Sequence, residues 1–183
     1  MKDGLMQAAE LVLSVLGSSA RPIDGRTAIQ KIAYFASIKA GIDVGYRPHF
    51  YGPYSADVAQ NLQNLESTGY MTETTRLTTH DRIMYSYCLN DDGQKMVREI
   101  QKREQSKYNK IKKVSEICEK VAKNNINVLS WAAKVYFLLS KKGSETSYNE
   151  VIQLGSQLGW KLSDREIDSG AKLLTRLGLV KKS

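Results

Sequence analysis

Apolar residues in the N-terminal part of the chain recur at the three- and four-residue spacing of amphipathic helices. Asp3, Asp24 and Ser55 each precede such a pattern, and they belong to the residue types preferred at helix N-caps. Gly41 follows the second pattern, where a left-handed C-terminal cap is expected. Three helices are therefore predicted: Asp3 to Leu16, Asp24 to Gly41, and Ala56 to Thr68.

The periodicity changes after the third helix. Tyr70 to Leu77 and Ile83 to Leu89 are rich in Thr, Tyr and Ile, and the loop Thr78 to Arg82 separates them. Two such runs joined by a short loop predict a β-hairpin. Three helices followed by a hairpin are the composition of a winged-helix domain, so residues 1–90 are predicted to form a winged-helix-like domain.

A long basic helix is predicted next, from Asp91 to Asn124, with a length of about 50 Å. Lys102 and Arg103 belong to its surplus of cations, which indicates either a solvated helix face or contact with phosphates. Four apolar residues keep helical spacing and predict an intermolecular seam, which leaves a homodimer open: Ile111, Val114, Cys118 and Val121.

The rest of the chain, residues 125–183, predicts a smaller helical unit with helices at Val128 to Leu139, at Ser147 to Leu158 and from Ser163 onward. Leu65 to Met71 and Leu174 to Val180 share one pattern: Leu, three residues, Gly, then two apolar residues. This pattern indicates a helix that stops at Gly and enters a strand. The predicted fold class is therefore mostly α with small β-hairpins, in which a winged-helix-like N-terminal unit, a long connecting helix and a second, smaller winged-helix-like unit follow one another.

An aromatic segment, Gly45 to Ser55, separates the second and third predicted helices. Pro48 and Pro53 forbid a continuous helix there, and so many Tyr and Phe residues are typical of a half-buried segment. One interpretation is a connector whose aromatic side chains fill the core between the two helices. The other is a surface that contacts a partner protein through four residues: Arg47, His49, Tyr51 and Tyr54.

The net charge of +8 favours a polyanionic partner, with double-stranded DNA first. The third predicted helix contains amides but no Lys or Arg, so the attraction to phosphates that dominates DNA affinity must come from other elements. The connection to the second helix is also longer than the three- or four-residue turn of a helix-turn-helix. The residues predicted to contact DNA are Gln60, Asn61, Asn64, Arg76, His80, Arg82, Lys102, Arg103, Lys172 and Arg176.

Several classes of protein are not expected. The sequence has no Gly-rich phosphate loop, no nucleophile elbow and no zinc-protease motif, and no carboxylate close in sequence orients His49, so no enzyme and no cofactor is predicted. Cys88 and Cys118 form neither a metal cluster nor a disulfide framework, so no metal and a cytoplasmic location are expected. No apolar run approaches the ~20 residues of a membrane span, so no membrane partner is expected.

Two segments resemble a known group of proteins. Ile29-Gln-Lys-Ile-Ala-Tyr-Phe-Ala36 resembles the helix signature L-Q-K-L-x-Y-x-A of the SocA-like (Panacea) antitoxins. Together with His49-Phe-Tyr-Gly-Pro-Tyr-Ser55 it resembles the YwgA-type proteins, over about Gly25 to Met71. The resemblance implies a winged-helix-related fold and a role in regulation or antitoxin-type protein binding. The matching positions are Gln30, Lys31, Tyr34, His49, Phe50, Tyr51, Gly52, Pro53 and Tyr54, and no catalytic residue is implied.

Two functions are compatible with these patterns. The first is a non-enzymatic winged-helix DNA-binding protein that regulates transcription. The alternative is an antitoxin- or adaptor-type interaction module that docks a partner through Tyr46 to Ser55. Clustering of Arg76, Arg82 and the lysines of the long helix on one face would favour DNA binding, whereas an exposed, contiguous aromatic patch around Tyr51 would favour the interaction module.

Overall fold

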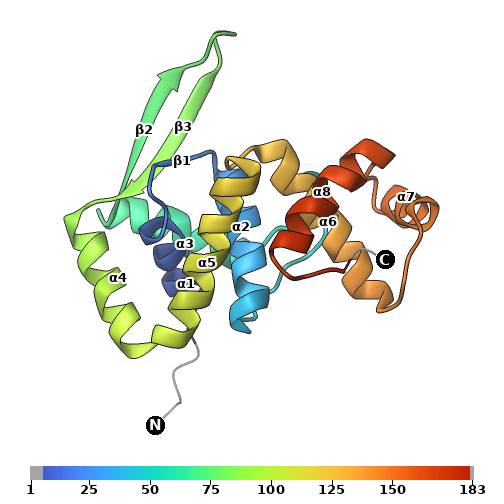
Figure 1. Ribbon diagram of the computed structural model, residues 1–183. Coiled ribbons are helices and arrows are strands. Elements are labelled where there is room, and N and C mark those ends of the chain that lie inside the picture. The colour runs from blue at the N-terminus through green and yellow to red at the C-terminus, as the bar shows by residue number, and fades with distance from the viewer. Residues whose placement is uncertain (1–5, 182–183) are drawn as a thin grey trace.

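The computed structural model describes residues 6–181 and shows a mostly helical chain with one small antiparallel sheet, as predicted (Figure 1). Its elements, in order, are α1 (Ala8–Gly17), β1 (Ile23–Asp24), α2 (Arg26–Ala40), α3 (Ala56–Ser67), β2 (Met71–Leu77), β3 (Ile83–Leu89), α4 (Asp91–Arg103), α5 (Gln105–Ala122), α6 (Ile126–Lys142), α7 (Tyr148–Gln157) and α8 (Asp164–Arg176). Within the described range, no helix combines the length and the apolar character that crossing a bilayer requires.

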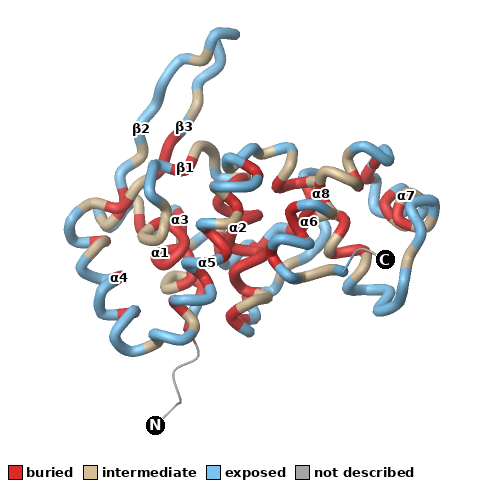
Figure 2. The backbone as a smooth tube through the Cα atoms, in the orientation of Figure 1, coloured by how far each residue is buried: buried red, intermediate tan, exposed pale blue. Residues whose placement is uncertain are grey.

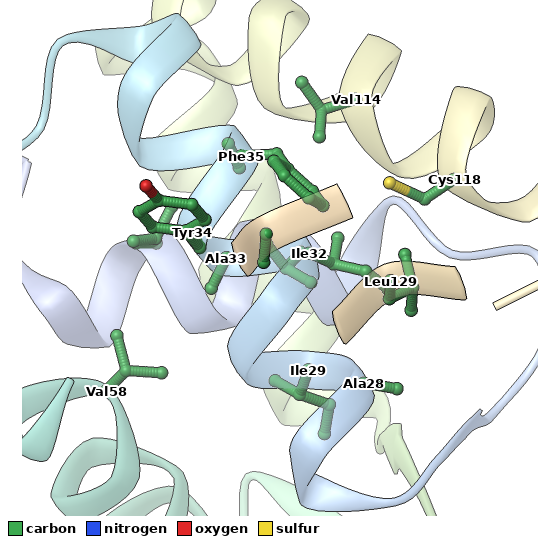
Figure 3. Packing of buried hydrophobic residues seen from close by; sticks show 14 of the residues in the cluster. Ala28, Ile29, Ile32, Ala33, Tyr34, Phe35, Val58, Val114, Cys118 and Leu129 are labelled. Atoms are coloured by element: carbon green, nitrogen blue, oxygen red, sulfur yellow. The ribbon is translucent and has the colours of Figure 1, made fainter. Parts of the chain in front are cut away.

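Helix α2 is the centre of the hydrophobic core. Its buried residues cover the whole circumference of the helix, and α1, α3, α5 and α6 all pack against it. Figure 3 shows Ile29, Ile32 and Phe35 of α2 among core side chains from α3, α5 and α6. Because α2 is buried on all sides, other elements enclose it, and it positions the segments that leave its two ends.

The sheet has the strand order β1-β3-β2, and both pairings are antiparallel. The predicted hairpin is confirmed, with a register that runs from Met71↔Leu89 to Leu77↔Ile83. The two-residue strand β1 was not predicted, because two residues are too few to show the alternation of apolar and polar positions that identifies a strand. The hairpin projects from the helical body, and its outer half is exposed on both strands (Figures 1 and 2).

The predicted helix ends in the N-terminal part are confirmed at some positions and wrong at others. Asp3 lies outside the described residues, and α1 begins only after Gln7. Asp24 does not cap α2, because it belongs to β1 and Gly25 takes the N-cap position instead. Gly41 adopts the expected left-handed conformation, and Ser55 caps α3 by accepting a hydrogen bond from the backbone N–H of Val58.

The predicted continuous helix from Asp91 to Asn124 is wrong. Helix α4 ends at Glu104 (φ −123°, ψ 40°), and α5 turns back beside it (Figure 1). Residues 101–107 are all polar, so this stretch has no apolar face to bury as a helix. The predicted intermolecular seam is also wrong, because Ile111, Val114 and Cys118 are buried against α2 of the same chain and only Val121 is exposed.

The C-terminal helices follow the prediction more closely than the segment after them. Ser147 and Ser163 cap α7 and α8, and each forms a capping box with the glutamate three residues later. The strand expected after Gly178 is absent from the described residues. Leu179 and Val180 pack against the hydrophobic core instead, so the expected second winged-helix-like unit has no strand between residues 125 and 181.

Candidate functional site

The aromatic segment between α2 and α3 forms a closed loop, residues 47–54, which we call the aromatic loop. The backbone groups of Arg47 and Tyr54 donate to each other's carbonyl oxygens over 2.9 Å in both directions, which ties the base together. Gly52 turns the tip with φ +99° and donates to the carbonyl oxygen of His49. A Cβ at Gly52 would lie 3.1 Å from Cγ of Lys134, so glycine suits both the conformation and the space.

Buried polar side chains of α2 hold the loop backbone from below. The side-chain amide of Gln30 donates to the carbonyl oxygen of Ser55 over 2.8 Å and accepts from its N–H over 3.1 Å. Nζ of Lys31 donates to the carbonyl oxygen of Pro53 over 2.6 Å. All four residues are buried, and a buried polar group that loses its partner is costly. The loop conformation is therefore fixed by the fold.

The charge state of Lys31 is unusual. The residue is only 2% exposed, and no carboxylate pairs with its ammonium among the described residues. Burial lowers the pKa of Lys31 to about 7, and the nearby positive charge of Lys134 adds to this effect. Near neutral pH, a large fraction of Lys31 is therefore uncharged beneath the loop.

One aromatic side chain of the segment belongs to the core. The hydroxyl of Tyr46 donates to the backbone carbonyl of Gln30 over 2.9 Å, and its ring lies 4.8 Å from that of Tyr34 in an edge-on arrangement. Burial raises the pKa of Tyr46 well above its usual value. For this residue, the interpretation of a core-filling connector is confirmed.

The side chains at the tip of the loop point to solvent. Phe50 is 73% exposed and Tyr51 is 57% exposed, and their ring centroids lie 4.9 Å apart with the rings nearly perpendicular. His49 and Tyr54 form a second exposed ring pair, 5.0 Å apart. The aromatic side chains around Tyr51 are therefore exposed, as an interaction surface requires.

A contact from the C-terminal part of the chain, which no pattern in the sequence indicated, also supports the loop. Nε1 of Trp160 donates to the carbonyl oxygen of His49 over 2.8 Å. Nζ of Lys134 lies 5.8 Å from the centroid of the Trp160 ring, on the side of α6. Trp160 is itself buried, so the loop rests on the helical body at its tip as well as at its base.

The predicted DNA-contacting residues of the hairpin and of α3 are in part engaged within the molecule. Arg76 pairs with Asp24 over 2.6 Å, whereas His80 and Arg82 are exposed at the turn of the hairpin. On α3, the amides bond within the helix: Gln60 donates to Asn64, and Asn61 donates to the carbonyl oxygen of Asp57.

The remaining predicted cations lie on other elements. Lys102 pairs with Glu99 over 2.8 Å, and Arg103 pairs with Glu10. Lys172 and Arg176 are exposed on α8. Figure 1 shows the hairpin tip and the turn between α4 and α5 at opposite ends of the molecule. The structure does not bring these residues together on one face.

The described residues contain no group of three or more His, Cys, Asp or Glu side chains arranged to hold a metal ion. Cys118 is buried, and burial raises the pKa of its thiol to about 12, so it is protonated at neutral pH.

A scan against models of protein families and a search of curated proteins gave no match for this chain.

Proposed function

We propose that this chain is a protein-interaction module of adaptor or antitoxin type, and that it docks a partner protein through the tip of the aromatic loop. The observation that carries the proposal is the exposed pair Phe50 and Tyr51. Large aromatic side chains dominate the energetics of protein interfaces when a partner buries them. His49 and Tyr54 flank the pair with groups that can also form hydrogen bonds.

The rigidity of the loop supports the proposal. The backbone contacts made by Gln30, Lys31 and Trp160 hold the loop before any partner arrives. Association loses less conformational entropy when the contacting residues are already ordered. A fixed loop with exposed aromatic side chains is suited to binding, whereas a loop that served only to connect two helices would not need exposed rings.

DNA binding is the second candidate, because a specific observation favours it. The element order α1-β1-α2-α3-β2-β3 and the sheet order β1-β3-β2 support a winged-helix interpretation, in which the hairpin would be the wing. His80 and Arg82 are exposed at its tip. Against this, Arg76 is paired with Asp24, and α3 carries Asp57 and Glu66 without any Lys or Arg.

Affinity capture from the native lysate tests the proposal. The double variant Phe50→Ala with Tyr51→Ala should lose a captured partner that the unaltered chain retains, and nuclease treatment should not affect the capture. The matched control is Leu77→Ala, because Leu77 is as exposed as Phe50 but lies on the hairpin. A partner that both variants retain would refute docking through the loop. A partner lost only after nuclease treatment would favour the DNA alternative.

A further inference from the structure

A groove lies beside the base of the aromatic loop, between the loop and the helices α6 and α7. Its volume is about 560 Å³, which is within the usual range of ligand sites. Apolar side chains of the two helices and of the residue that ends α7 line it: Phe137, Leu138, Leu154 and Leu158. Neither Phe50 nor Tyr51 contributes to the lining, so the groove is a different surface from the loop tip.

A second hollow of about 360 Å³ adjoins the groove and shares Tyr46, Phe137 and Lys141 with it. This hollow continues across the C-terminal end of α2 to the segment 41–44. The two hollows meet at these shared residues, so together they extend from α7 to the segment 41–44. Such a shape suits a stretch of polypeptide, which contacts a surface at several successive side chains.

The rim of the larger groove is positively charged. Arg47 has no ion-pair partner among the described residues, and Nζ of Lys141 lies 5.5 Å from the centroid of the Phe137 ring. Lys142 also lines the groove but pairs with Glu150 over 2.5 Å. No Asp or Glu lines the larger groove, whereas Asp43 lines the adjoining hollow. The complementary ligand therefore carries carboxylates next to apolar side chains.

We propose that this groove binds an acidic amphipathic peptide segment of a partner protein, with apolar side chains on the floor formed by α6 and α7 and carboxylates at Arg47 and Lys141. The inference does not depend on the role proposed for Phe50 and Tyr51. It adds a second contact surface next to the first, with its own chemical preference.

Titration of the isotope-labelled chain with two synthetic peptides, followed by NMR, tests the inference. One peptide has leucines at positions i, i+3, i+4 and i+7 and glutamates elsewhere, and the other has lysines in place of the glutamates. The acidic peptide should bind and shift the amide signals of α7, whereas the basic peptide should not. The double variant Arg47→Ala with Lys141→Ala should bind the acidic peptide about tenfold more weakly, because two charge pairs are lost.

Two control variants separate the groove from other surfaces. Lys110→Ala with Lys113→Ala removes the same charge from α5, where both lysines are exposed, and should leave the affinity unchanged. Phe50→Ala with Tyr51→Ala should also leave it unchanged, so the two proposals can fail independently. The groove proposal is overturned if the acidic peptide does not bind saturably, if both peptides bind equally, or if the groove variant binds like the unaltered chain.

Discussion

The buried Lys31 predicts a dependence of stability on pH that a single substitution removes. A lysine in the unfolded chain has its usual pKa of 10.5, whereas burial lowers the pKa of Lys31 to about 7 in the folded chain. Between these values the unfolded chain holds a proton that the folded chain lacks, so the free energy of unfolding decreases as the pH falls. The free energy of unfolding falls by at most about 1.4 kcal/mol for each pH unit. At pH 7 the burial of Lys31 has lowered it by about 4–5 kcal/mol in total.

Methionine matches the length of the lysine stem and has no charge to bury, so Lys31→Met is the informative variant. It also removes the hydrogen bond to the carbonyl oxygen of Pro53, which costs about 1–3 kcal/mol if that oxygen stays buried and unpaired. The variant should therefore be more stable than the unaltered chain near pH 7 by about 1–4 kcal/mol. At pH 10 it should be less stable by about 0.2–2 kcal/mol, because about 0.8 kcal/mol of the cost of burying Lys31 still remains in the unaltered chain at that pH. The order of stability should reverse between these limits.

Urea unfolding followed by circular dichroism, at several pH values from about 7 to 10, measures this reversal. The quantity to plot against pH is the difference in the free energy of unfolding between the variant and the unaltered chain. Groups that both proteins share then cancel, such as Cys118, whose pKa is raised to about 12 by burial. Lys161→Met is the matched control, since Lys161 is exposed, and its difference should not change with pH. If the difference in the free energy of unfolding for Lys31→Met does not change with pH, the folded chain keeps Lys31 charged, and the reasoning is refuted.

Three further outcomes are expected. Tyr51→Ala should lower stability by less than about 1 kcal/mol, against about 3–5 kcal/mol for a buried ring, while partner capture weakens; a thermal melt separates the two cases. Val114→Asp should unfold the chain by placing a charge in the core, and circular dichroism would contradict this if the variant stayed folded. Trp160→Phe removes the hydrogen bond to His49 and should cost about 1–3 kcal/mol by chemical unfolding; an unchanged midpoint would show that the contact does not stabilise the loop.

The features that the sequence predicted correctly depend on neighbouring residues. Ser55 could be assigned as a cap, and Ser147 and Ser163 as helix starts, because each hydroxyl accepts from a backbone N–H only three residues along the chain. The hairpin is local in the same sense, since a short loop joins its strands. Gly41 could be placed because a left-handed residue at a helix end favours glycine strongly.

The features that the sequence did not predict depend on distant residues. The apolar stripe with Val114 shows that α5 buries one face, but such a stripe is the same whether its partner is α2 or a second chain. Trp160 and His49 are 111 residues apart, and no local pattern connects them. The break at Glu104 had only one signal in the sequence, the polar run 101–107, which is equally typical of an exposed helix.

The aromatic segment supported two interpretations because the fold separates its backbone from its side chains. The backbone of residues 53–55 lies against Gln30 and Lys31 in the core, whereas the rings of Phe50 and Tyr51 extend into solvent. The composition of the segment shows which residue types are present but not which of their atoms are buried. The same tyrosines and prolines therefore indicated both a core-filling connector and a contact surface. If a partner docks on the tip as proposed, substitutions below the loop should weaken binding only by changing the order of the loop, while substitutions at the tip should remove contacts with the partner directly.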